Sequence, residues 1–295
     1  MRLAHIINPV IVKSSSDLYQ AQPITFASMQ AAREYAQSQG VMVDIYTAQY
    51  TEDRGLVPPG FTMTPDLEQS VLDYGNFNIP RRLPLIRDIL DRLYQAAEEA
   101  DYLIYTNVDI ALVTHFYLAV AALIEQGYDA FTINRRVISK SWTNISQIPI
   151  MSAEVGKAHK GHDCFIFPRS VYPRYYLPNL CLGAFRVGMG VLVNMLYQGA
   201  RFELFKNLHL TYHLGNDRAH RSPALDDYKV YNEAEFIKLL DYYDIVQHPR
   251  EHYIIQGLAK HYIPKTFVSR MKGVLLKPLW KMRRIAAALK QNDDG

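Results

Sequence analysis

The fold is decided by residues 102–109, which read YLIYTNVD. The run at 102–105 has the length and composition of a short buried strand, and a polar turn ending at Asp109 follows it. A helix is expected directly before this strand, over residues 84–100, because apolar side chains recur there at helical spacing. Another is expected after the turn, over about residues 114–126. Helix, strand and helix in this order are typical of a parallel α/β sheet.

Towards the N-terminus the sequence repeats this pattern. Residues 3–12 carry a buried-strand pattern that is closed by Asn8-Pro9. A helix is expected over residues 23–39, with Gly40 as its C-cap, and a second strand over residues 41–46. The N-terminal half therefore predicts a parallel sheet, and ligands of such sheets bind beyond the carboxyl ends of the strands.

The remaining segments alternate less regularly. Residues 50–80 are rich in Pro, Gly, Thr and Asp, which predicts an irregular excursion over a ligand site. Further strands are expected over 130–134, 163–167 and 208–214, and further helices over 187–198 and 233–246. The fold class expected is α/β, with a mixed, mostly parallel sheet flanked by helices and a basic helical tail.

The composition is that of a folded globular protein without a disulfide framework. The chain has 295 residues, about half of them apolar, and its two cysteines, Cys164 and Cys181, lie outside any C-x-x-C pair. A zinc ribbon or redox motif therefore has no support, and a cytoplasmic setting is expected. The N-terminal apolar run predicts a first strand, not a signal peptide. The sequence contains no uninterrupted apolar stretch of about 18 residues, so no membrane-spanning helix is expected.

The net charge of +3 is unevenly distributed along the chain. Residues 252–290 carry nine Lys and Arg and no Asp or Glu, whereas residues 1–251 carry 23 basic and 27 acidic side chains. An acidic body argues against nucleic acid as a partner. Residues 267–289 mix basic side chains with Trp280 and aliphatic ones. Two alternatives follow: attachment to an anionic membrane surface at its inner face, or a helix docked on the acidic body.

Asn107 and Asp109 place two oxygen ligands on one side of the turn that ends the central strand. Hard cations such as Mg²⁺ and Mn²⁺ prefer oxygen ligands and often join protein carboxylates to phosphates. An ordinary structural role is the alternative, in which Asn107 shapes the turn and Asp109 caps the next helix. The local pattern leaves both interpretations open.

Polar residues further along the chain offer the other groups that such a site needs. Asp163 stands directly before an apolar strand, where its carboxylate would orient an acceptor hydroxyl or act as its general base. Guanidinium groups suit phosphate, although a structural ion pair is the alternative for each one. The arginines in question are Arg135, Arg136 and Arg169.

Histidines form a second group of potential ligands. His209 and His213 are four residues apart, so on the expected strand both would face the same side. A surface pair without function is the alternative. A separate zinc site would draw its ligands from His159, His162, Asp163, His209 and His213.

Taken together, these features resemble the nucleotide-diphospho-sugar glycosyltransferases of the GT-A fold. A helix, a four-residue apolar strand and an x-x-D turn stand about a hundred residues into a β-α-β start, where that family has its D-x-D motif. The resemblance covers residues 3–215. Its signature segments are residues 105–110, 134–136, 161–169 and 209–213.

The resemblance implies a GT-A-like domain over residues 1–250, followed by the helical tail 251–295. It implies transfer of a sugar from a nucleotide-diphospho-sugar donor to a saccharide or lipid-linked acceptor. Asp109 would bind Mn²⁺ or Mg²⁺ and the diphosphate, and His213 would complete the metal shell. Asn107 departs from the family pattern, which usually has Asp in that position.

The donor nucleoside would lie over the first strands, near Asn8, Pro9 and Tyr46. Two other functions remain open: a GT-A-like scaffold without turnover, which Asn107 favours, and a metal-dependent hydrolase that uses the histidines. The sequence has no G-x-G-x-x-G, P-loop or G-x-S-x-G motif. Dehydrogenase, kinase and serine-hydrolase interpretations therefore lack their signatures.

Overall fold

The computed structural model describes residues 1–215 and 222–271, with side chains described as far as Tyr262. The chain divides into two compact units, Met1–Leu239 and Leu240–Gly295. Helix α6 (Asp226–Tyr242) runs from the first unit into the second, and α7 (Tyr253–Met271) belongs to the second. Most of the basic tail, 272–295, lies outside the described residues. Within the described ranges, every helix is too short or too polar to cross a bilayer.

A seven-stranded sheet forms the centre of the first unit, in the order β10-β6-β9-β4-β1-β2-β3. All neighbouring pairs are parallel except those of β9, which runs antiparallel to β4 and β6. The strands are β1 (Arg2–Ile7), β2 (Met42–Thr47), β3 (Thr62–Met63), β4 (Tyr102–Thr106), β6 (Ala130–Ile133), β9 (Cys164–Pro168) and β10 (Phe202–Phe205). The mixed, mostly parallel α/β sheet predicted from the sequence is confirmed.

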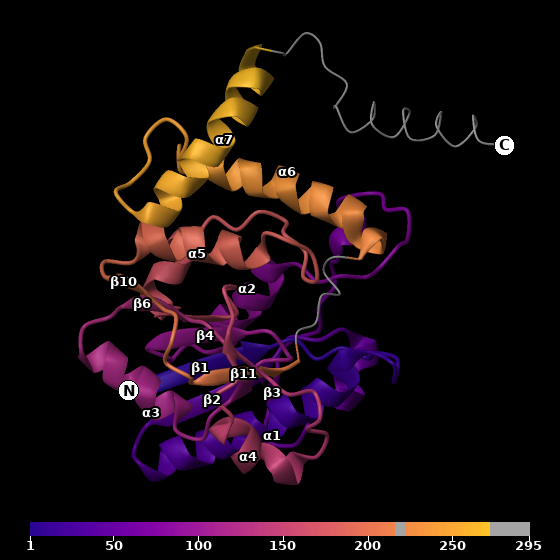
Figure 1. Ribbon diagram of the computed structural model, residues 1–295, viewed down its shortest axis with the longest axis vertical. Helices are drawn as coiled ribbons and strands as arrows, with labels where there is room; N and C mark the ends of the chain where they lie inside the picture. The colour runs from indigo at the N-terminus through magenta and orange to yellow at the C-terminus, as the bar shows by residue number, and fades with distance from the viewer. Residues whose placement is uncertain (216–221, 272–295) are drawn as a thin grey trace, which may run out of the picture. The chain divides into compact units, whose positions relative to one another are not determined.

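Helices cover both faces of this sheet, as Figure 1 shows, with α2 and α5 on one face and α1 and α3 on the other. Residues 2–7 of β1 and 102–106 of β4 are almost entirely buried, as the apolar runs predict. The helices are α1 (Asp17–Ser38), α2 (Ile86–Ala96), α3 (Phe116–Glu125), α4 (Ile148–Ala153) and α5 (Val187–Gln198).

A second sheet of four short strands lies at the end of the central strand, in the order β5-β11-β7-β8. Its strands are β5 (Ala111–Leu112), β7 (Arg136–Ile138), β8 (Lys157–Ala158) and β11 (Thr211–Leu214). β5 pairs with β11 antiparallel, with Ala111 opposite Tyr212. This register brings Asp109, two residues before Ala111, next to the carboxyl end of β11.

The bounds of several elements differ from those predicted. α1 begins at Asp17 instead of residue 23, because the Ser16 hydroxyl accepts from the Leu18 N–H as an N-cap. α2 ends at Ala96 and not at residue 100. The strand predicted over 208–214 covers only Thr211–Leu214, and His209 has a φ of 54° that breaks the extended backbone. His209 therefore lies outside the strand, and the expectation that His209 and His213 face the same side of one strand is wrong.

Candidate active site

Polar side chains collect where the strands of the large sheet end. Asn8 follows β1, Asn107 follows β4, and Arg135 lies just beyond β6. Asp163 directly precedes β9, and because β9 is antiparallel its beginning lies at the same edge, with Cys164 opposite Thr106. The fold thus brings four of the predicted residues to the carboxyl edge of the sheet.

Asp109 and His213 meet at this edge although they are far apart in the sequence. The Oδ2 atom of Asp109 lies 3.0 Å from Nε2 of His213. Both side chains are largely buried, with exposed fractions of 19% and 3%. The antiparallel pairing of β5 with β11 is what places them side by side.

The tautomer of His213 follows from its second hydrogen bond. Nδ1 lies 2.8 Å from the carbonyl oxygen of Gly215, and a carbonyl only accepts, so Nδ1 carries a proton. Nε2 therefore faces Asp109 with a lone pair when the ring is neutral, or with a second proton when it is charged. Burial lowers the pKa of His213, but the hydrogen bond and charge of Asp109 outweigh it, and the net shift is upward.

This pair fits a divalent cation. Oδ1 of Asp109 is buried and has no hydrogen-bond partner, and the lone pair of a neutral Nε2 would otherwise face a carboxylate. Adjacent ligands of an octahedral ion at about 2.1 Å lie about 3.0 Å apart, close to the observed separation. An imidazole whose other nitrogen donates to a carbonyl is also the usual arrangement of a metal-bound histidine. Carboxylate and imidazole together suit Mn²⁺ at least as well as Mg²⁺.

Asp163 is held by an arginine from the neighbouring strand end. Nη1 of Arg135 lies 2.7 Å from Oδ1 of Asp163, and each side chain is 10% exposed. Oδ2 of Asp163 has no hydrogen-bond partner. Nδ1 of His159 lies 3.5 Å from this oxygen and already accepts from the Gly161 N–H. One oxygen of Asp163 is thus fixed and the other remains available to a ligand.

The charge state of Asp163 follows from these contacts. Burial raises its pKa, whereas His159 and the positive charge of Arg135 lower it, and the net pKa lies below its usual value. The carboxylate is therefore ionised at neutral pH. Such a group accepts a hydrogen bond strongly, and its low pKa limits its strength as a base.

Several unsatisfied buried atoms lie at this edge. Besides Asp109 Oδ1 and Asp163 Oδ2, the amide oxygen of Asn134 and Nε of Arg135 are buried without a partner. Buried polar groups are nearly always hydrogen-bonded in native proteins, so several unpaired ones close together indicate that a ligand completes the site. Asn134, whose Nδ2 donates to the His159 carbonyl at 2.9 Å, lies in the signature segment 134–136 but was not among the predicted site residues.

Asn107 has a partner within the protein. Its Oδ1 accepts from the hydroxyl of Tyr105 at 2.9 Å, so its side chain is held in the turn. Asn8 is buried, and its Nδ2 donates to the carbonyl of Ala48. Pro9 is buried beside it. The segment after Pro9 is fixed by Gln22, whose side-chain amide bonds both the N–H and the carbonyl of Val10 at 2.9 Å.

Two arginines predicted to bind the donor are engaged elsewhere. Arg136 donates to the carbonyls of Val155 and Gly156 and to Nε2 of His209. Arg169 follows the far end of β9, where it stacks 4.1 Å above the ring of Tyr94 and donates to its carbonyl. The structure therefore does not bring Arg169 to the carboxyl edge, and it gives Arg136 a structural role.

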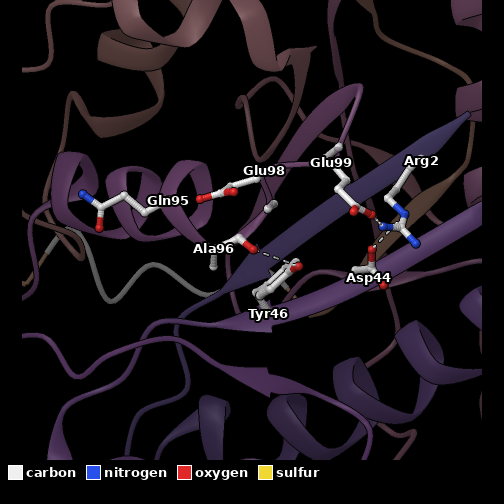
Figure 2. Close-up of a pocket in the computed structure, with 9 residues that line it drawn as sticks. Arg2, Asp44, Tyr46, Gln95, Ala96, Glu98 and Glu99 are labelled. Carbon is white, nitrogen blue, oxygen red and sulfur yellow. Dashed lines mark hydrogen bonds and ion pairs between the residues drawn. The ribbon is translucent and has the colours of Figure 1, made fainter.

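Tyr46 points away from the strand ends. Its hydroxyl lies 3.4 Å from the carbonyl of Ala96, at the end of α2. Figure 2 shows it in a pocket of about 240 Å³ with Arg2, Asp44 and Glu99. This pocket is lined by the beginning of β1 and the residues that follow α2, so the predicted contact between Tyr46 and a nucleoside at the carboxyl edge is not supported.

The five-residue zinc site considered from the sequence does not form. Residues 159, 162, 163, 209 and 213 all lie within the described part of the chain, where no three His, Cys, Asp or Glu side chains are grouped to hold a metal ion. The physical reason is that His209 accepts from Arg136 at 2.6 Å and His159 accepts from Gly161. Neither imidazole joins His213.

Solved structures with the same fold support the resemblance to GT-A proteins. Residues 1–349 of Staphylococcus aureus TarS, in complex with UDP-GlcNAc, superpose with a TM-score of 0.54 and 11% identity over 92% of this chain and 75% of that one. The same segment without the sugar nucleotide gives 0.50 and 10% identity, over 97% and 79%. The chain has a GT-A-like fold.

More distant matches add no detail to the site. A Drosophila β1,4-galactosyltransferase 7 variant in complex with manganese, UDP-Gal and xylobiose superposes with a TM-score of 0.40 and 13% identity, over 75% of this chain and 74% of that one. No protein-family model matches the sequence, and no curated protein matches it. At these identities the comparisons establish the fold alone.

Proposed function

We propose that this protein is a glycosyltransferase that uses a nucleotide-diphospho-sugar donor with a divalent cation at Asp109 and His213. The observation that carries this proposal is the buried Asp109–His213 pair, with its unpartnered carboxylate oxygen and its fixed imidazole tautomer, at the carboxyl edge of a GT-A-like sheet. Ligands of open α/β sheets bind at such an edge.

Asp109 and His213 would hold Mn²⁺ or Mg²⁺, and the ion would supply positive charge to a leaving diphosphate. The carbonyl of Gly215 keeps the Nδ1 proton of His213 in place, so that Nε2 stays aimed at Asp109. The Tyr105 hydroxyl holds Asn107 in the turn. The donor would then extend from this pair towards Asn8 and Pro9.

Asp163 would bind the acceptor. Its Oδ2 is a strong hydrogen-bond acceptor, because the carboxylate is ionised and its other oxygen is fixed by Arg135. A sugar hydroxyl that donates to Oδ2 would be oriented for attack and would pass its proton to the same oxygen. Arg135 thus fixes Asp163 in place. The diphosphate would be bound by the cation that Asp109 and His213 hold.

The test is calorimetric titration of the full chain with UDP-GlcNAc, other UDP-sugars and GDP-sugars, each with and without Mn²⁺. UDP-GlcNAc is the first choice because it is the ligand present in the TarS complex. We expect binding that requires Mn²⁺ and is lost in Asp109→Asn, while Asp44→Asn at the opposite edge binds normally. Binding that is indifferent to Mn²⁺, or equal in both variants, would contradict the proposal.

A nucleotide-binding scaffold without turnover is the second candidate. It is favoured by one observation: Asn107 replaces a carboxylate, and its amide oxygen is already engaged by Tyr105. Donor hydrolysis, followed by release of the nucleoside diphosphate in the presence of Mn²⁺, separates the two candidates. Tight donor binding with no hydrolysis and no transfer to any saccharide would favour the scaffold.

A further inference from the structure

We propose that the acceptor at this site is an anionic saccharide, which binds to a basic surface formed by residues 155–162 and 205–209. The proposal rests on the transferase function above and specifies its acceptor class. The two segments and the neighbouring residues 134–138 contain five Lys and Arg, three His and no Asp or Glu. Residues 1–251 as a whole carry more acidic than basic side chains, so the net charge of these segments is opposite in sign to that of the body.

Backbone contacts bring the three segments together. The Asn134 N–H donates to the carbonyl of Phe205 at 2.9 Å, and the His159 N–H donates to the carbonyl of Arg135 at 3.1 Å. β8 pairs with β7, with Lys157 opposite Val137. These separate stretches of sequence therefore form one continuous surface beside Asp163.

Strand register places Lys157 on the same face of the small sheet as His213, one of the two proposed metal ligands. His213 lies opposite Val137, and Val137 lies opposite Lys157, so all three side chains point to one face of the small sheet. Two strand spacings separate His213 from Lys157, or roughly 10 Å.

Two lysines of this surface, Lys157 and Lys160, are available to a ligand. Lys157 and Lys160 are both exposed, and within the described residues neither has an ion-pair partner in the protein. Lys206 is exposed as well. Burial lowers the pKa of His162 against the opposing charge of Asp163, and the positive charges of His159 and Lys206 lower it further, which places Lys206 near His162. Two exposed lysines without an ion-pair partner, Lys157 and Lys160, favour anionic ligands beside this site.

Two acidic side chains flank the first segment, and each makes contacts within the protein. Oδ1 of Asp163 is paired with Arg135. Glu154, just before the first segment, accepts from the Trp142 indole N–H and from the Ser139 N–H. The donor diphosphate already has the proposed metal at Asp109 and His213 to neutralise it. The exposed lysines are therefore assigned to phosphate or carboxylate groups of the acceptor.

The test compares three fluorescently labelled dextrans of equal chain length: neutral dextran, carboxymethyl dextran and dextran phosphate. Anisotropy titrations of the full chain should show binding of the charged forms only, with an affinity that falls as salt rises. The stronger of the two charged arms distinguishes carboxylate from phosphate. In Lys157→Glu/Lys160→Glu, we expect at least about tenfold weaker binding, because each reversed charge changes attraction into repulsion.

Matched variants distinguish binding at this surface from nonspecific attraction of anions to the positive charges of the whole chain, including those of the basic tail. Arg81→Glu/Arg174→Glu changes the net charge by the same amount at exposed positions outside the three segments, and it should bind within about twofold of wild type. Lys157→Arg/Lys160→Arg should retain binding. Equal weakening in both Glu double variants would overturn the proposal.

Donor binding distinguishes failure of this proposal from failure of the proposed function. UDP-GlcNAc with Mn²⁺ should bind the Lys157→Glu/Lys160→Glu variant as it binds wild type. If the variant loses the donor instead of the charged dextrans, the lysines serve the diphosphate and the anionic-acceptor proposal is wrong. If no variant, wild type included, binds a donor, the transferase proposal fails independently of the dextran results.

Discussion

The two edges of the large sheet differ in how completely the protein pairs its own charges. At the amino edge the charges are paired within the protein: Arg2 contacts both Asp44 and Glu99, and its N–H donates to Asp101 at 2.8 Å. Arg169 stacks on Tyr94 there, and its Nε is the one buried atom of these side chains that lacks a partner. At the carboxyl edge Asp109 and Asp163 each keep one buried oxygen without a partner. The comparison teaches that a pocket lined by charges is a weak sign of a binding site. Buried groups that the protein leaves unsatisfied are a stronger one.

The largest expected effect is that of Asp109→Asn on metal and donor binding. We expect Mn²⁺-dependent binding of UDP-GlcNAc to weaken by more than about 100-fold, since even the partners of a metal ligand typically contribute 10–100-fold. The fold should survive, because an Asn amide can donate to the Nε2 lone pair of His213. Electron paramagnetic resonance of Mn²⁺ and thermal unfolding measure the two quantities. A variant that unfolds, or one that still binds Mn²⁺ tightly, would erase the contrast between the edges.

Arg135→Met should show how much the buried ion pair at the carboxyl edge matters. It leaves the charge of Asp163 buried and unpaired, which should lower the free energy of unfolding by about 3 kcal/mol. Arg135→Met/Asp163→Asn should recover much of that loss. Urea unfolding of the wild type, both single variants and the double variant gives the coupling energy. Additive losses would mean that the pair does not act as a unit.

His5, on β1, provides a test of the contrast because it is a buried side chain whose two ring nitrogens both have hydrogen-bond partners. Its ring nitrogens lie 2.9 Å from the hydroxyls of Tyr117 and Thr106, and burial lowers its pKa to about 3. The unfolded chain binds a proton at His5 below about pH 6.5, whereas the folded chain does not until about pH 3. Stability is therefore lost as the pH falls between these values.

The expected size of this loss is about 3 kcal/mol between pH 7 and pH 4.5. In His5→Gln the same loss should be absent, so the stability advantage of wild type should shrink by that amount on acidification. Urea unfolding at several pH values measures it. An advantage that stays constant from pH 7 to pH 4.5 would show that His5 is not the group that titrates.

The smallest effect is expected at the amino edge. Glu99 is 80% exposed and pairs with Arg2 at the surface, so Glu99→Gln should change the free energy of unfolding by less than about 0.5 kcal/mol. Donor binding should not change. Thermal unfolding at low and high salt is the measurement. A loss comparable to that of Arg135→Met would show that the two edges do not differ in the way their charges are used.

Most of the elements that form the sheet could be predicted from their local patterns. The runs 102–105 and 164–167 are buried strands, and α2 buries the expected stripe of Leu and Ile. The two-residue strands β3, β5 and β8 were not predicted, because so short a segment has no periodicity of its own. The short strands β7 and β10 were not predicted either. The β11 prediction was too long, since the positive φ of His209 depends on its bond to Arg136 and not on its neighbours in sequence.

The same division applies to the site. The sequence alone determined that a polar turn ends the central strand at Asn107 and Asp109, because apolar runs and polar breaks are local properties of the chain. Only the tertiary structure decided which distant groups join that turn. It brought His213 through the pairing of β5 with β11, and Asp163 through the reversed direction of β9. Tyr46 and Arg169 do not lie at the site. The direction of a side chain depends on packing between elements that are distant in the sequence, so local patterns could not predict this.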